Sequence, residues 1–122
     1  MTERHWVAAA AFNLLVAVAA GAFGAHGLKA VLTPAVLAIW QTAVTYQMVH
    51  GLGLLAVALL MPHWPGRTLG WVAAAMLVGM LLFCGSLYLL ALSGIRVLGA
   101  ITPLGGVAFL LAWALLGWRA LR

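Results

Sequence analysis

The sequence has very little charge for its length. Among its 122 residues, six are Lys or Arg and one, Glu3, is acidic. Soluble domains carry about a quarter of their residues as charged side chains. At 6% charged and 67% hydrophobic, this chain cannot cover a folded core with a water-facing surface. We therefore expect most of its surroundings to be the hydrocarbon of a lipid bilayer.

The shortage of carboxylates and thiols excludes several kinds of chemistry. Glu3 alone cannot form the carboxyl pair of a hydrolase, and no Gly-rich loop precedes a Lys to bind phosphate. The one cysteine, Cys84, excludes an internal disulfide and lies in an apolar run, where a thiol is unreactive. The basic residues are scattered singly, which argues against a nucleic-acid partner. We predict a protein that is not an enzyme and uses no cofactor.

The sequence does contain four long apolar segments, at residues 6–25, 34–61, 69–92 and 97–118. Each reaches the roughly 20 residues needed to cross a hydrocarbon core. The connections are short, which makes neighbouring segments antiparallel, and open chains cross lipid as helices. The first segment resembles a signal peptide, but its length favours a retained helix. We predict one all-α domain, an integral membrane four-helix bundle of two helical hairpins.

The distribution of Lys and Arg predicts the orientation of the bundle. Four spans put both termini and the middle connection on one side of the membrane. That side holds Arg4, Arg67, Arg119 and Arg122, and the other holds Lys29 and Arg96. The excess predicts that both termini face the cytoplasm. The same boundary is expected to hold the indoles of Trp6, Trp64, Trp71 and Trp118.

Two similar motifs precede the second and fourth segments. "GLKAVLTP" and "GIRVLGAITP" both run from glycine through a cation to Thr-Pro. Thr33 and Thr102 are expected to cap helices that start at Pro34 and Pro103. The motifs suggest two parallel repeats, although helix starts draw on few residue types and the likeness is equally explained by coincidence.

Small residues recur at roughly helical spacing in three of the segments. They include Gly21, Gly24, Gly27, Ala75, Gly79, Gly85, Gly105 and Gly106. Close backbone approach drives helix association in lipid, so we interpret them as packing surfaces. The alternative is that flat faces line a permeation path.

The stretch "WQTAVTYQMVHGLG" places many hydrogen-bonding groups inside the second segment. Tyr46 and His50 are four residues apart and share a helix face. Gln41 and Thr45 form a neighbouring stripe, and Gln47 flanks the same region. Each such group costs several kcal/mol if it is unpaired in hydrocarbon. This face is therefore expected to turn toward protein.

Partners for this face can be sought at matching depth. Asn13 in the first segment lies near the level of His50, and Ser86 in the third lies near the level of Gln41. We predict an Asn13–His50 and a Ser86–Gln41 hydrogen bond, with Tyr88 at the outer interface. The predicted polar pocket comprises Asn13, His26, Gln41, Thr45, Tyr46, Gln47, His50 and Ser86.

Two interpretations of the pocket remain open. Its hydrogen bonds either hold the helices together, or His50 and its neighbours bind a ligand, a proton or a metal. A copper site would combine His50 with Met48, Met76 or Met80. The sequence has no HxxxH, CxxC or Met-rich repeat, so we predict no metal site.

Four ordered motifs resemble a known family. "GAFGAHGL", "WQTAVTYQMVHGLGLL", "FCGSLYLLALSG" and "ITPLGGVAFLLAW" are similar to the YgdD-type family of small bacterial inner-membrane proteins, a domain-of-unknown-function group with animal relatives. Cys84 departs from the small hydroxyl residue expected there. The resemblance implies a multi-pass protein of the bacterial inner (plasma) membrane and does not imply an activity.

These observations lead to two functional hypotheses. The first is a helper or scaffold that binds a lipid, a lipophilic small molecule or a membrane-protein partner through the buried polar pocket. The alternative is a minimal transporter, or a unit that conducts protons or metal ions, using His50 and Tyr46. In either case we expect the bundle to pack into a homo-oligomer.

Overall fold

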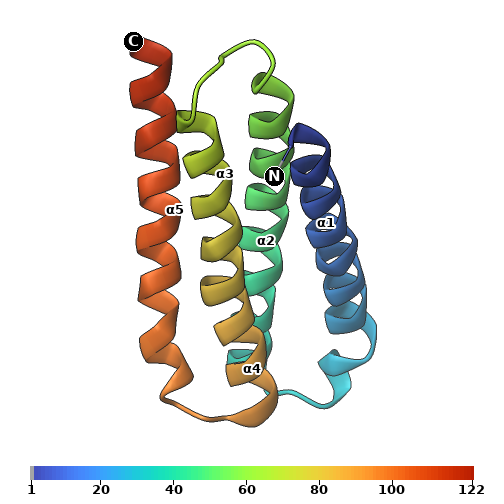
Figure 1. The fold of residues 1–122 in the computed structure, drawn as a ribbon. Coiled ribbons are helices and arrows are strands. Elements are labelled where there is room, and N and C mark those ends of the chain that lie inside the picture. Colours follow the sequence, from blue (N-terminus) through green and yellow to red (C-terminus); the bar gives the residue numbers. More distant parts are fainter. Residues whose placement is uncertain (1) are drawn as a thin grey trace.

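The computed structural model describes residues 2–122 and shows long helices that run alternately up and down (Figure 1). The helices are α1 (Glu3–His26), α2 (Pro34–Leu60), α3 (Thr68–Gly79), α4 (Gly85–Ser93) and α5 (Leu98–Leu121). A short 3-10 turn, Leu28–Ala30, follows α1. The residues Met80–Cys84 form a π-helical turn that joins α3 to α4. No strand occurs in the described part of the chain.

Four helical stretches are long and apolar enough to cross a membrane. They are Glu3–Ala30, Pro34–Leu60, Thr68–Ser93 and Leu98–Leu121, of 28, 27, 26 and 24 residues. At 1.5 Å per residue, α-helices of these lengths extend roughly 36–42 Å, more than the hydrocarbon core of about 30 Å. The prediction of an all-α four-helix membrane bundle is confirmed.

The two Thr-Pro motifs start their helices differently. Before α2, the Thr33 hydroxyl accepts a hydrogen bond from the Val36 N–H (3.3 Å) and Pro34 is the first helical residue, as predicted. The prediction for the fourth helix was wrong, because α5 begins at Leu98 and contains Pro103. Pro103 has no N–H to donate to the carbonyl of Gly99, four residues earlier. The Thr102 hydroxyl donates to the adjacent carbonyl, that of Leu98 (3.4 Å).

The helices form a row rather than a closed ring. α1 packs along α2, α2 packs against the rod made by α3 and α4, and α5 packs along that rod. Within an 18-residue apolar stretch of each span, half of the α2 residues are buried, compared with 17% of the residues in α1 and in α5. α1 and α5 are therefore the edges of the row, and α2 has protein on several sides.

Glycines set the closest helix contacts. A Cβ atom on Gly105 of α5 would collide with the backbone nitrogen of Phe83 in the π-helical turn. A Cβ atom on Gly79 would meet the Phe109 ring, and one on Gly24 would lie 2.7 Å from the Trp40 ring. These contacts support the packing interpretation of the small residues. Gly85 is different, because a Cβ atom there would meet nothing within 4 Å.

Candidate functional site

A directional chain of hydrogen bonds crosses three helices. The Tyr88 hydroxyl of α4 donates to Gln47 Oε1 of α2 (2.7 Å). Gln47 Nε2 donates to Asn13 Oδ1 of α1 (3.4 Å). Asn13 Nδ2 then donates to the carbonyl of Ala9, one turn back along α1 (2.9 Å). Each amide accepts through its oxygen and donates through its nitrogen, so the chain joins α1, α2 and α4 without a conflict of donors.

His50 has both ring nitrogens engaged. Its Nδ1 lies 2.8 Å from the carbonyl oxygen of Tyr46, and Trp113 Nε1 donates to its Nε2 (3.0 Å). A carbonyl only accepts and an indole N–H only donates, so Nδ1 carries the proton and Nε2 is the acceptor. The arrangement fixes one neutral tautomer. Phe109 stacks on the imidazole with ring centroids 3.6 Å apart.

An aromatic groove lies beside His50, between α2 and α5. Its volume is about 490 Å³, and its lining is Tyr46, His50, Phe83, Pro103, Gly106, Val107, Phe109, Leu110 and Trp113. The Tyr46 ring packs on Phe83 at 4.5 Å between centroids, and 41% of Tyr46 is exposed. Within residues 2–122, the Tyr46 hydroxyl has no hydrogen-bond partner. The groove is thus apolar with one free hydroxyl.

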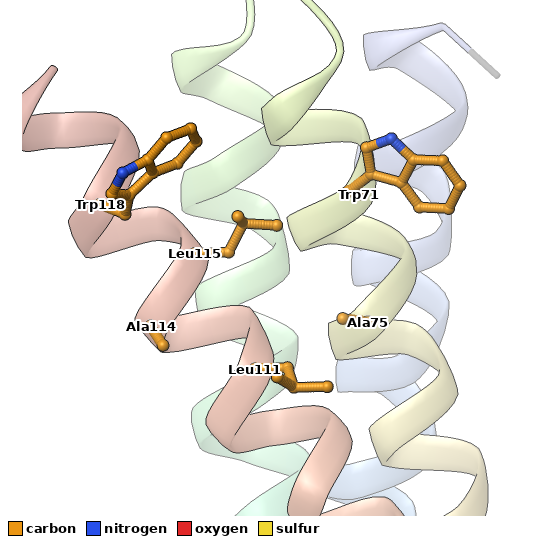
Figure 2. A pocket seen from close by; sticks show the side chains of 6 residues that line it. All are labelled: Trp71, Ala75, Leu111, Ala114, Leu115 and Trp118. Carbon is orange, nitrogen blue, oxygen red and sulfur yellow. The ribbon is translucent and has the colours of Figure 1, made fainter.

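A second groove lies on the other flank of α5, against α3 (Figure 2). It has a volume of about 470 Å³ and an apolar lining of Trp71, Ala75, Leu111, Ala114, Leu115 and Trp118. Figure 2 shows the two indoles at the same end of the groove, with Ala75 and Leu111 further along it. The two grooves share no residue.

The structure divides the predicted polar pocket. Asn13, Gln47, His50 and Ser86 are buried, and Tyr46 is partly exposed in the aromatic groove. The other three predicted residues do not join them. His26 is exposed at the end of α1, and Gln41 and Thr45 lie on the exposed side of α2. The Thr45 hydroxyl donates to the Gln41 carbonyl within its own helix (3.0 Å).

The predicted pairs of polar residues were wrong. Asn13 bonds Gln47 rather than His50, and Ser86 bonds Thr102 (2.6 Å) rather than Gln41. Depth along a helix gives the level of a side chain but not the neighbour that it faces, and residues three apart on α2 face different helices.

Several residues that bond or pack between the helices were not predicted to do so from the sequence. Tyr88, placed at the outer interface by the prediction, donates to Gln47 and lies against Trp40 with ring centroids 4.6 Å apart. Trp40 Nε1 donates to the carbonyl of Ala20 on α1 (2.9 Å). The sequence could have indicated a hydrogen bond for Trp113, because this residue lies well inside an apolar segment, where an indole N–H needs a partner.

Metal binding receives no support from the geometry. No group of three or more His, Cys, Asp or Glu side chains comes together among residues 2–122. His50 Nε2, the nitrogen that a metal would use, already accepts from Trp113. The copper site considered for His50 would require that hydrogen bond to break.

Comparison with known proteins identifies relatives along most of the chain. The family model described as "Protein of unknown function (DUF423)" matches residues 20–106. UPF0382 membrane protein SSP2132 of Staphylococcus saprophyticus is 49% identical over 109 residues, which cover 87% of this chain and 88% of the relative. UPF0382 membrane protein YwdK of Bacillus subtilis is 47% identical over 116 residues, 92% of each chain. No solved structure matches. The resemblance to a family of membrane proteins of unknown function is confirmed, under a different family name.

Proposed function

This chain belongs to the DUF423 family of membrane proteins, and we propose that it is a helper protein that holds a lipophilic small molecule in the aromatic groove between α2 and α5. The ligand carries a flat ring and a hydrogen-bond acceptor. The observation that carries this proposal is the free Tyr46 hydroxyl in an otherwise apolar groove. We place the protein in the bacterial plasma (inner) membrane, because its relatives are membrane proteins of bacteria.

The depth of Tyr46 supports a ligand rather than water as the partner of its hydroxyl. Tyr46 lies 12 residues into α2, about 18 Å along the helix, near the middle of a bilayer. An unpaired hydroxyl at that depth costs at least 1 kcal/mol. A ligand carbonyl or ether would accept its hydrogen bond, and the rings of Phe83 and Phe109 offer faces for stacking.

The hydrogen bonds of His50 favour ligand binding over proton conduction. A proton relay needs a nitrogen that is free to exchange protons, and both nitrogens of His50 have fixed protein partners. Every buried polar side-chain atom in the described residues has a partner. The alternative of a proton or metal pathway would have to open this network first.

The proposal is tested with an alkylated naphthoquinone as the probe, because it combines a flat ring, two carbonyl acceptors and an apolar tail. The probe is expected to raise the thermal unfolding midpoint of the protein purified in detergent. Tyr46→Phe removes one hydrogen bond and should weaken binding roughly three- to tenfold. A midpoint that the probe does not change would contradict the choice of ligand class.

A matched pair of variants locates the binding site. Gly106→Leu should fill the groove and abolish the shift, because a Cβ atom on Gly106 has only the Phe83 ring at 4.0 Å nearby. Gly117→Leu makes the same change in the same helix, where nothing lies within 4 Å, and should bind the probe normally. Equal binding of the probe by both variants would show that the probe does not bind in the aromatic groove.

A homo-oligomer remains part of the proposal, with Gln41 as its support. Gln41 lies about 10 Å into α2 and is exposed, and its side chain bonds no group within residues 2–122. A carboxamide both donates and accepts, so Gln41 residues of two copies can satisfy each other. Gln41→Leu should lower the dimer fraction in liposomes, measured by energy transfer between labelled chains. Thr45→Val, on the same face, should leave that fraction unchanged.

A further inference from the structure

The groove between α3 and α5 has a tryptophan on each side, and an arginine lies beyond each tryptophan at the end of its helix. Arg67, the N-cap residue of α3, precedes Trp71 by four residues, and Arg122, the residue after α5, follows Trp118 by four residues. Each indole therefore has an arginine about one turn beyond it, at the end of its helix. Both pairs lie at the end of the row where α3 begins and α5 ends (Figure 1).

We propose that this groove binds an anionic phospholipid, with one acyl chain in the groove and the phosphate beside Arg67 and Arg122. The volume of about 470 Å³ and the lining of Ala75, Ala114 and leucines suit an alkyl chain. The indoles of Trp71 and Trp118 lie at one end of the groove (Figure 2), and indoles prefer the depth at which acyl chains meet headgroups.

The charges at this end select an anion. The Arg122 guanidinium stacks over the Trp118 ring, which lines the groove, at 4.8 Å from its centroid. Arg67 is exposed and lines an adjoining hollow, which shares Trp71 with the groove. Arg119 is engaged elsewhere, over Trp64 and with the carbonyl of Pro65 (3.4 Å). Glu3, the one acidic side chain, is on α1 at the opposite edge of the row.

The site is separate from the aromatic groove in lining and in chemistry. The aromatic groove offers a hydroxyl donor near the middle of the helices, whereas this one offers two cations at their ends. A failure of either proposal therefore leaves the other intact.

Native mass spectrometry of the purified protein tests this proposal, with dioleoyl phosphatidylglycerol and dioleoyl phosphatidylcholine as probes. These lipids share their acyl chains and differ in net charge. The first bound molecule of phosphatidylglycerol should bind more tightly than the first bound molecule of phosphatidylcholine. The double variant Arg67→Gln with Arg122→Gln should lose most of that preference. Each cation near an anionic surface contributes about fivefold, so the expected loss is about 20- to 30-fold. Lys29→Gln with Arg96→Gln makes the same charge change at the other end and should preserve the preference.

The apolar part of the site has its own control. Ala114→Phe places a ring in the groove and should weaken binding of both lipids. Ala100→Phe, also exposed on α5, should not. Equal binding of the two lipids to the unaltered protein would overturn the proposal. So would a loss of preference in the Lys29 and Arg96 variant that equals the loss in the Arg67 and Arg122 variant. A dimer that Ala114→Phe abolishes would assign the groove to a second copy instead.

Discussion

At the scale of single residues, the polar groups of this protein are arranged in complementary pairs. Gln47 receives a hydrogen bond from Tyr88 and gives one to Asn13, and His50 receives one from Trp113. Lipid would leave these groups unpaired, so each helix supplies the group that its neighbour lacks. The imidazole is therefore a fixed acceptor for an indole rather than a free base.

The pair formed by His50 and Trp113 leads to a stability prediction. Trp113→Phe keeps an aromatic ring but removes the N–H that His50 Nε2 accepts. Such bonds in membrane bundles contribute about 0.6 kcal/mol on average, and we expect a loss of unfolding free energy of that order. Denaturation by SDS in mixed micelles would measure it. Trp118→Phe, whose indole lies at the end of α5 and is 52% exposed, should change this free energy little.

The sequence predicted which polar residues would be buried better than it predicted their partners. Eight polar residues were expected to face protein. Asn13, Gln47, His50 and Ser86 are buried, whereas His26, Gln41, Thr45 and Tyr46 are exposed. That expectation rests on the cost of polar groups in lipid, which holds for any arrangement of helices. Their pairing depends on which helix lies on each side of α2, and composition and depth carry no information about that.

At the scale of the helices, the sequence predicted the start of α2 but not the start of α5 or the π-helical turn. Thr33 and Pro34 form a local signal that acts within four residues. The same signal at Thr102 and Pro103 does not start a helix: α5 begins at Leu98, and the Thr102 hydroxyl lies 2.6 Å from Ser86 Oγ of α4. The π-helical turn at Met80–Cys84 has no pattern in "MLLFC" that marks it. Its backbone is the surface on which Gly105 packs.

The close contact at Gly105 predicts a large effect from a single methyl group. Gly105→Ala would push α5 away from the backbone of Phe83, and overpacking of this kind costs about 1–3 kcal/mol. Gly117→Ala, in the same helix, meets nothing within 4 Å. It should be neutral or stabilising by about 0.5–1 kcal/mol through helix propensity. Unfolding of the two variants in SDS compares them directly, and equal effects would contradict the close approach.

At the scale of the whole molecule, the row of helices leaves its two edge helices largely exposed. Lipid, a ligand or a second copy must cover α1 and α5, because the chain itself buries only 17% of an 18-residue apolar stretch of each. The sequence predicted four spans from length and hydropathy, which are properties of each segment alone. It could not predict the row, because the order of the helices depends on glycine contacts between segments far apart.

The orientation of the row in the membrane is a prediction of its basic residues. With both termini in the cytoplasm, the connection between α2 and α3 is cytoplasmic and that between α4 and α5 is external. In a Cys84→Ala background, Ile95→Cys should react with an impermeant maleimide on intact cells. His63→Cys should react only after lysis. Both positions are exposed, so the opposite pattern of labelling would reverse the topology.

The paired hydrogen bonds and the scarcity of charge together predict a bundle that does not leak protons. A conducting path needs groups that exchange protons along the membrane depth, and the polar groups here run across the bundle from α4 to α1. Liposomes that contain the protein should hold a pH gradient as long as empty liposomes do, while gramicidin should collapse it. A leak that His50→Gln abolishes would show that His50 conducts and that its hydrogen bond to Trp113 opens in the bilayer.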